Sequence, residues 1–287
     1  METEFNCHFC DVCDGYGCVG QMPGMGGPNA SRNFILNCAA WKSVGKGPFE
    51  PGEIEVRLAP MTGAVENVGY FDEKQFYFDL VASCVESGIK ITIGDGTPDF
   101  KLFWGIEAVE FYQKKNPSLK AGVFIKPYPD EKIFERYEKA MNIMEFGGID
   151  IDSYNIITMR NLVHLEKKSA SDLIALKKFL SSKGIPFAVK GVFNSEDIEV
   201  MEEVKPDIVC ISNHGGRVDV RQGSTAEFLK ENYRRLKNCC GRLWVDGGIR
   251  TMEDVRTAST FGADGVMMGR PFATALCQKK SFSEVLK

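Results

Sequence analysis

The hydrophobic positions along most of the chain fall into short apolar runs separated by more polar segments. From about residue 53 there are eight such runs, which cover residues 54–59, 89–93, 121–125, 148–151, 187–189, 208–211, 243–245 and 265–268. Each run has the length and composition of a strand buried in a parallel sheet. We therefore predict eight strands along the chain.

The segments between these runs have the spacing of helices. Apolar side chains recur every three or four residues over residues 133–144 and 173–180, which predicts one helix in each segment. Asn194 has the character of a helix N-cap, and Thr251 followed by Asp254 three residues later is typical of a capping box. Strands and helices should therefore alternate.

Eight strands that alternate with helices fit either a doubly wound sheet or a closed barrel. The count of eight favours the barrel, and 287 residues suit a single domain of that kind. We predict an α/β fold, a (β/α)8 TIM barrel, over residues 51–287. Residues 1–50 are rich in glycine and proline without sustained periodicity, and they predict a loop-rich, cysteine- and glycine-rich N-terminal extension.

Composition narrows the function classes only a little. A net charge of -4 and a pI near 5.6 provide no electrostatic case for binding nucleic acid or an anionic membrane. The first residues lack the basic start and apolar core of a signal peptide, and no apolar run reaches the roughly 18 residues of a membrane helix. We therefore expect a cytoplasmic protein.

Unusual residues follow the predicted strands, where a barrel places its chemistry. Two glycine-bearing loops, residues 246–250 (Asp-Gly-Gly-Ile-Arg) and 269–271 (Gly-Arg-Pro), each lead into a predicted helix. Glycines let the backbone approach a phosphate, and the first N–H groups of a helix point toward it. Either loop alone could be an ordinary tight turn. Two neighbouring loops with an arginine each favour a phosphate site.

The segment Ser-Asn-His-Gly-Gly-Arg, residues 212–217, follows the sixth predicted strand. His214 has the side chain expected of a general base, and Arg217 could bind a carboxylate through two N–H groups. A lone histidine in a loop is usually structural. The glycines and arginine beside this one favour a functional role.

Charged residues also end the fourth and fifth predicted strands. Lys190 ends an apolar strand, where a buried ammonium needs a charged partner; a surface lysine is the alternative. Asp150 and Asp152 alternate at the fourth strand end and should point the same way. One of these carboxylates beside His214 would orient its ring, whereas helix capping is the plainer interpretation.

Together these motifs resemble the FMN-dependent 2-hydroxy-acid oxidases and dehydrogenases, the family of glycolate oxidase and flavin-type lactate dehydrogenase. The likeness is specific over about residues 184–275 and weaker at residues 58–62. It implies an FMN-dependent enzyme that oxidises a small 2-hydroxy acid to the 2-oxo acid.

The resemblance also implies a role for each matching residue. His214 would be the catalytic base, and Asp152 the carboxylate that pairs with it. Arg217 and Tyr128 would bind the substrate, and Arg160 is the nearest candidate for a second substrate-binding arginine. The residues implied to contact FMN are Lys190, Ser212, Asp246, Gly248, Arg250, Gly269 and Arg270.

The chain departs from the family pattern at two strand ends. Lys126 stands where the family usually has glutamine, and Gly94 stands where it has serine or threonine. These changes fall in the expected substrate and flavin surroundings, so they leave the identity of the hydroxy acid open. They also keep open a flavin-barrel isomerase or reductase.

Four cysteines near the N-terminus lie outside the oxidase pattern. Cys7, Cys10, Cys13 and Cys18 could hold zinc or an iron–sulfur cluster, because four thiolates suit either. Free thiols or a redox disulfide are the alternatives, and a non-catalytic metal or redox protein is a further hypothesis. The sequence does not specify the electron acceptor, and a homo-oligomer stays open.

Overall fold

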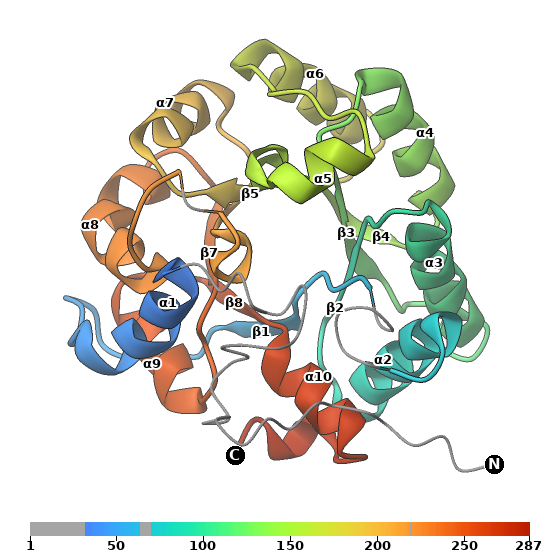
Figure 1. The fold of residues 1–287 in the computed structure, drawn as a ribbon, viewed down its shortest axis with the longest axis horizontal. Helices are drawn as coiled ribbons and strands as arrows, with labels where there is room; N and C mark the ends of the chain where they lie inside the picture. Colours follow the sequence, from blue (N-terminus) through green and yellow to red (C-terminus); the bar gives the residue numbers. More distant parts are fainter. Residues whose placement is uncertain (1–31, 64–69, 219) are drawn as a thin grey trace.

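A computed structural model describes residues 32–63, 70–218 and 220–287, and its eight strands form a parallel barrel (Figure 1). The strands are β1 (Glu55–Leu58), β2 (Ile91–Gly94), β3 (Ala121–Ile125), β4 (Met144–Asp150), β5 (Phe187–Val192), β6 (Ile208–Ile211), β7 (Arg242–Asp246) and β8 (Gly265–Met268). They are hydrogen-bonded in the order β1-β8-β7-β6-β5-β4-β3-β2. A bridge between Arg57 and Lys90 joins β1 to the start of β2 and closes the ring. The predicted (β/α)8 barrel is confirmed.

Most of the helices surround the sheet on its outer side, and one short helix lies over an end of the barrel (Figure 1). They are α1 (Arg32–Ser43), α2 (Glu73–Ser87), α3 (Phe100–Gln113), α4 (Asp130–Ala140), α5 (Ile157–Leu162), α6 (Ala170–Ser181), α7 (Ser195–Val204), α8 (Thr225–Lys237), α9 (Met252–Thr260) and α10 (Arg270–Cys277). Short 3-10 turns are η2 (Ile151–Asn155), η3 (His214–Gly216) and η4 (Phe282–Glu284). Every helix in the described part of the chain is too short or too polar to span a bilayer.

The predicted helix caps are confirmed, whereas one predicted helix is too long. Asn194 and Thr251 each accept a hydrogen bond from the backbone three residues later and form capping boxes. The helix predicted over residues 133–144 ends at Ala140, and Met144 begins β4 instead. The apolar spacing continues across this boundary because both the helix face and the strand pack into the same core.

Helix α1 lies in the segment that we expected to be loop-rich. It packs beside α8 and α9 on the outside of the barrel (Figure 1). Its apolar side chains lack regular helical spacing, and its buried residues include Asn33 and Asn37. Residues 1–31 lie outside the described part of the chain, and the domain boundary at residue 50 stays a prediction.

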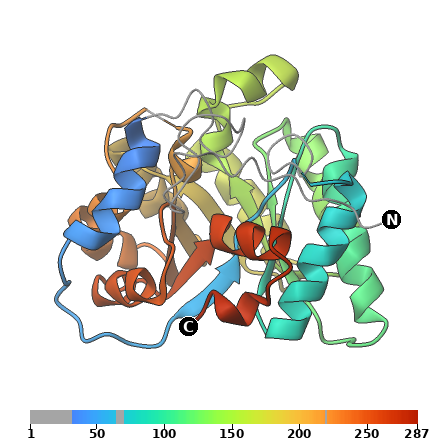
Figure 2. The ribbon, with the colours of Figure 1, turned by 60° about the horizontal axis from the view of Figure 1, so that its bottom comes forward.

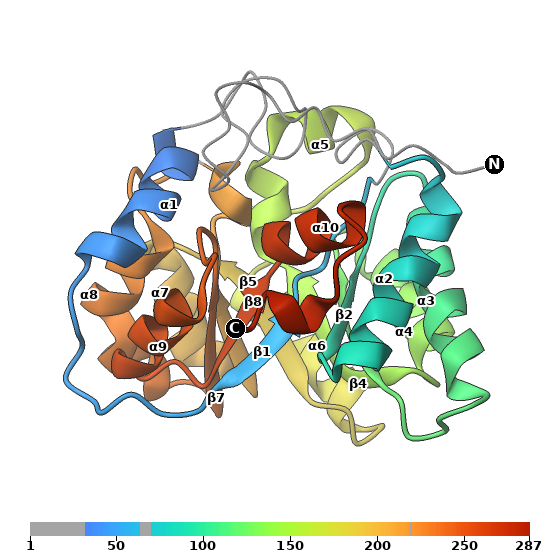
Figure 3. The ribbon, with the colours of Figure 1, turned by 90° about the horizontal axis from the view of Figure 1, so that it is seen from below.

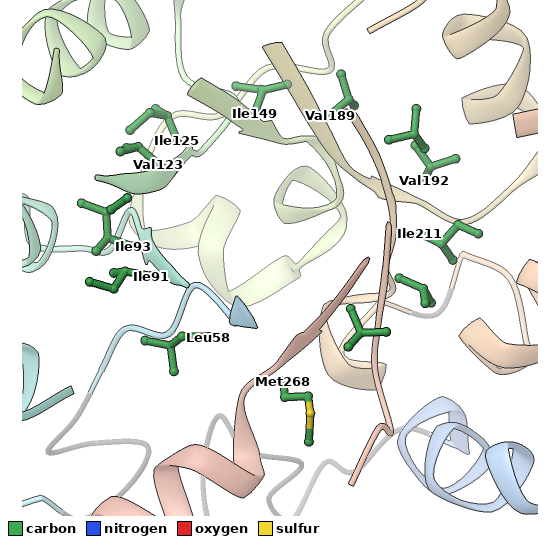
Figure 4. Close-up of a cluster of buried hydrophobic side chains, with 14 of the residues drawn as sticks. Leu58, Ile91, Ile93, Val123, Ile125, Ile149, Val189, Val192, Ile211 and Met268 are labelled. Atoms are coloured by element: carbon green, nitrogen blue, oxygen red, sulfur yellow. The ribbon is translucent and has the colours of Figure 1, made fainter. Parts of the chain in front are cut away.

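The apolar core has two layers, because successive side chains of a strand point to opposite faces of the sheet. The outer layer lies between strands and helices, where the strand side chains drawn in Figure 4 point away from the barrel interior. The inner layer fills the barrel itself and comprises Phe124, Phe146, Ala188, Ile208, Cys210, Trp244 and Met267.

The inward-facing positions change from apolar to polar toward the carboxyl ends of the strands. The next inward-facing positions, two residues nearer the carboxyl ends of the strands, are polar. They are Lys126, Asp150, Lys190, Ser212 and Asp246, all of them buried. This polar rim lies at the end of the barrel where α5 is placed (Figure 2, Figure 3). The period of two along each strand therefore positions the site.

Candidate active site

Lys190 is the centre of the polar rim. Its Nζ lies 2.8 Å from Asp150 Oδ1, 3.9 Å from Asp152 Oδ1 and 3.8 Å from Asp246 Oδ2. Burial disfavours its ammonium, but the three carboxylates outweigh burial and raise the pKa of Lys190 above its ordinary value. The lysine is therefore a fixed positive charge in the wall of the site.

His214 sits directly above this cluster, in the turn that follows β6. Its Nδ1 lies 3.1 Å from Asp152 Oδ1 and 3.5 Å from Asp150 Oδ2. Its backbone N–H donates to Ser212 Oγ at 3.1 Å, which anchors the turn to the strand end. With Nδ1 facing the carboxylates, Nε2 is the nitrogen available to a ligand.

The approach of Asp152 to the rim depends on a glycine in β5. Gly191 has a φ of 104°, and a Cβ at this position would lie 2.6 Å from the backbone nitrogen of Asp152. A side chain here would push η2 away from the strand. The Gly191 backbone thus allows Asp152 to reach His214.

His214 and Asp152 both have pKa values shifted from their ordinary range. Burial lowers the pKa of His214 below its usual range, against the opposing charge of Asp150. Burial, and then the charge of Asp150, raise the pKa of Asp152. The imidazole is therefore uncharged near neutral pH, and the charge of Asp150 acts on both groups. An uncharged imidazole can accept a proton.

Arg217 lies where two cavities meet, since it lines both of them together with His214. Among the residues that the structure describes, its guanidinium has no hydrogen-bond or ion-pair partner. Its N–H donors therefore face the cavities, where a carboxylate could accept two of them.

The first cavity, which we call the glycine-loop cavity, has a volume of about 190 Å³. Its walls come from α1, the loop after β1, and the loops after β7 and β8. The predicted cofactor residues that line it are Lys190, Asp246, Gly248, Arg250, Gly269 and Arg270. Ser212 is fully buried beneath it. The tertiary structure thus brings the two glycine-bearing loops to one cavity.

The second cavity, which we call the lysine cavity, has a volume of about 170 Å³. It extends from Arg217 and His214 over the carboxyl ends of β2, β3 and β4. Its polar lining on that side consists of Asp95, Thr97, Lys101, Lys126 and Asp150. This wall carries both lysines and aspartates, whereas the glycine-loop cavity has Arg250 and Arg270 in its wall.

Helix α1 connects the turn that carries His214 to the glycine-bearing loop after β7. Asn37 exchanges two hydrogen bonds with the side chain of Asn213, at 2.7 Å and 3.1 Å, and accepts a third from the backbone of Thr225 at 3.0 Å. Trp41 Nε1 donates to the carbonyl of Gly247 at 2.8 Å. The sequence carries no local signal for these contacts, because the partners lie more than 170 positions apart.

Two predicted substrate residues lie away from both cavity linings. Tyr128 is 1% exposed, and its ring packs under Arg136, with the guanidinium carbon 4.7 Å from the ring centroid. Arg160 lies on the exposed side of α5, over the ring of Tyr154. The neighbouring side chains of α5 that do line the lysine cavity are apolar, Met159 and Leu162. The predicted metal ligands Cys7, Cys10, Cys13 and Cys18 lie outside the described residues.

Comparison with known proteins places the chain among flavin enzymes. A sequence profile described as FMN-dependent dehydrogenase matches residues 114–281. The chain is 38% identical over 109 residues to L-lactate dehydrogenase (cytochrome) of Saccharomyces cerevisiae, a match that covers 36% of this chain and 18% of the yeast protein. It is 30% identical over 138 residues to glycolate oxidase 3 of Arabidopsis thaliana, covering 46% of this chain and 37% of that protein. The matched segment is thus well under half of either relative.

Solved structures share the fold at low sequence identity. Flavocytochrome b2 with sulfite bound superposes with a TM-score of 0.65 at 20% identity, over 88% of this chain and 72% of that one. A mandelate oxidase Y128F variant superposes with a TM-score of 0.66 at 17% identity, over 88% and 81% of the two chains.

Proposed function

The chain belongs to the FMN-dependent dehydrogenase family, and from this premise we propose that it oxidises a small 2-hydroxy acid to the corresponding 2-oxo acid. The observation that carries the proposal is the junction of the two cavities. There an uncharged imidazole held by Asp152 stands beside an arginine whose N–H donors are unused within the described residues.

The residues around the glycine-loop cavity fit FMN. Gly248 has a φ of 79°, and a Cβ there would lie 2.1 Å from the Asn37 carbonyl oxygen, so only glycine permits this close loop. Arg250 and Arg270 supply positive charge for a phosphate, and α9 and α10 begin beside them. Lys190 would face the flavin as a permanent cation.

The protein side of the reaction follows from the positions of three side chains. FMN, when bound, supplies the two-electron acceptor for conversion of the alcohol carbon to a ketone. Arg217 binds and orients the substrate carboxylate. His214 Nε2 accepts one of the two protons that the hydroxy acid loses, and the other would pass to FMN together with the two electrons. Nδ1 of His214 stays hydrogen-bonded to Asp152. Asp152 thereby stabilises the imidazolium that forms.

The test is the effect of His214→Gln on flavin reduction without oxygen. We expect the wild-type protein, purified with FMN, to lose its flavin absorbance on addition of lactate, glycolate or a related hydroxy acid. The variant should keep its FMN and be reduced about 10²–10⁴-fold more slowly, because it lacks the base.

His164→Gln is the matched control, since the His164 side chain is 75% exposed and pairs with Glu166 on the surface. Near-normal reduction of the His214→Gln protein would contradict the assignment of the base. A wild-type protein that holds FMN but is reduced by no hydroxy acid would contradict the proposed reaction and leave the cofactor site intact.

A further inference from the structure

The lysine cavity holds more polar groups than a substrate with one carboxylate can use. Arg217 at its mouth suffices for that carboxylate. Beyond it, the wall formed by the ends of β2 and β3 presents Lys126 and Thr97 to the same space. Lys126 has fewer hydrogen-bond partners than its ammonium can use, and the hydroxyl of Thr97 is buried beside that of Tyr128.

Lys126 is a buried ammonium with one hydrogen-bond acceptor. It is 6% exposed, and its Nζ donates to the backbone carbonyl of Asp95. Within the described ranges, no carboxylate oxygen lies within the 4.0 Å of an ion pair with it. A lysine ammonium has three N–H donors, so two remain for a ligand.

The carboxylates nearest to Lys126 are committed to other cations. Asp95 Oδ1 lies 2.5 Å from Arg136 Nη1, and Asp150 Oδ1 lies 2.8 Å from Lys190 Nζ. Burial lowers the pKa of Lys126, with Asp95 and Asp150 opposing that shift and Arg136 and Lys101 adding to it. The charge of Lys126 is therefore only partly compensated by its protein surroundings.

Thr97 adds a second unused donor on the same wall. Its buried hydroxyl lies beside that of Tyr128, with which it can share a hydrogen bond, and neither hydroxyl has another partner among the described residues. A hydrogen bond between two hydroxyls uses only one of their two O–H donors, so one donor remains. A buried hydroxyl donor that stays unused is unfavourable. A ligand with acceptor oxygens would satisfy both Thr97 and Lys126.

We propose that Lys126 and Thr97 bind a second carboxylate of the substrate, and that the protein acts on 2-hydroxy dicarboxylates. This inference rests on the proposed function, in which Arg217 holds the carboxylate next to the reacting carbon. A dicarboxylate supplies the anion that Lys126 lacks, whereas an alkyl tail would leave this ammonium buried against hydrocarbon.

The test compares acids of equal length with and without the second carboxylate. For the FMN-loaded protein, we would measure kcat/KM for malate against 2-hydroxybutyrate and for 2-hydroxyglutarate against 2-hydroxyvalerate. Calorimetric titration with the products 2-oxoglutarate and 2-oxovalerate measures binding apart from turnover. We expect the wild type to have a higher kcat/KM for the diacid in at least one of the two pairs. We also expect it to bind 2-oxoglutarate more tightly than 2-oxovalerate.

Lys126→Met should reduce that preference about 10- to 100-fold, the range for a lost hydrogen bond to a charged group. Its effect on the monoacid should be small. Lys126→Gln keeps N–H donors without the charge, so its preference for the diacid should lie between those of the wild type and Lys126→Met. Lys139→Met is the matched control, because Lys139 is exposed on α4 and pairs with Glu135.

Two results would overturn the proposal. One is equal loss of activity toward both acids together with a changed FMN affinity or flavin midpoint potential, which would assign Lys126 to the cofactor. The other is a wild-type preference for monoacids in both pairs, which would leave the proposed oxidation standing. If no hydroxy acid reduces the flavin, the proposed function fails, and the titrations with the 2-oxo acids still decide whether Lys126 binds a second carboxylate.

Discussion

Asp150 connects the two side chains on which the site depends, Lys190 and His214. It ends β4 between Lys190, to which it is bonded, and His214, whose Nδ1 lies 3.5 Å from its other oxygen. Burial and, against it, the charge of Lys190 are the largest influences on Asp150, and the net effect lowers its pKa. The carboxylate therefore stays negative and acts on both His214 and Asp152.

Asp150→Asn should move the acid limb of the pH profile of kcat/KM to lower pH. The negative charge of Asp150 raises the pKa of His214 and that of Asp152, so its removal lowers both. The base would then stay unprotonated at lower pH than in the wild type. The measurement is the rate of flavin reduction against pH without oxygen.

Asp130→Asn is a suitable control for that profile, because Asp130 lies at the start of α4 and pairs with Lys168. A limb that moved to higher pH, or one that stayed in place, would show that the charge of Asp150 does not control the proton affinity of His214.

At the scale of elements, α1 stands apart from the barrel helices. It follows no predicted strand, yet its side chains Phe34, Asn37 and Cys38 line the glycine-loop cavity. Asn213 Oδ1 accepts hydrogen bonds from both Asn37 and the backbone N–H of Gly216. The helix thus holds the turn that carries His214.

Asn37→Ala should weaken this turn and lower stability by about 1–3 kcal/mol, because it leaves buried polar groups of Asn213 and Thr225 with fewer partners. We expect lower FMN affinity and a lower kcat/KM, measured by flavin fluorescence and by substrate-dependent reduction. Asn238→Ala is the control, at the exposed end of α8. Unchanged FMN affinity and turnover in the Asn37 variant would contradict a positioning role for α1.

At the scale of the whole molecule, a buried charged cluster that stabilises the barrel and the two cavities of the candidate site lie at opposite ends of the strands. Arg57, inside the amino end, lies 2.6 Å from Glu55 Oε1 and 2.5 Å from Glu145 Oε2. It also stacks near the rings of Phe146 and Trp244. None of these residues lines either of the two cavities at the carboxyl end.

Arg57→Met should therefore destabilise the fold without changing the activity of the folded protein. We expect a loss of roughly 2–3 kcal/mol in the free energy of unfolding, because a buried charged partner is removed while Lys90 and Arg242 still neutralise the glutamates. Thermal and urea unfolding measure it. Arg235→Met, at an exposed pair with Glu202, should change the midpoint little. An intact midpoint in the Arg57 variant would refute the structural role.

The barrel and half of the candidate site could be predicted from sequence because their signals are local. A short apolar run predicts a strand, and Lys190, His214 and Asp246 lie at or just after the ends of such runs. Parallel strands of a barrel end on one rim, so residues after different strands must meet. Cap residues such as Asn194 are equally local.

Other parts of the site depend on contacts that no local pattern records. The burial of Tyr128 beneath Arg136, the amide pair of Asn37 with Asn213, and the exposure of Arg160 all arise from packing between distant elements. The sequence pattern likewise does not indicate that α4 ends at Ala140, because apolar residues continue at the same spacing into β4.

The sequence alone thus determined the barrel, the rim positions of the candidate site residues and the flavin family, because these follow from period-two strands and short contiguous motifs. Only the tertiary structure decided which carboxylate meets His214, which cation each carboxylate pairs with, and that Lys126 keeps unused donors within the described residues. Those properties depend on distances of a few ångströms and on burial, and both exist only once the chain has folded.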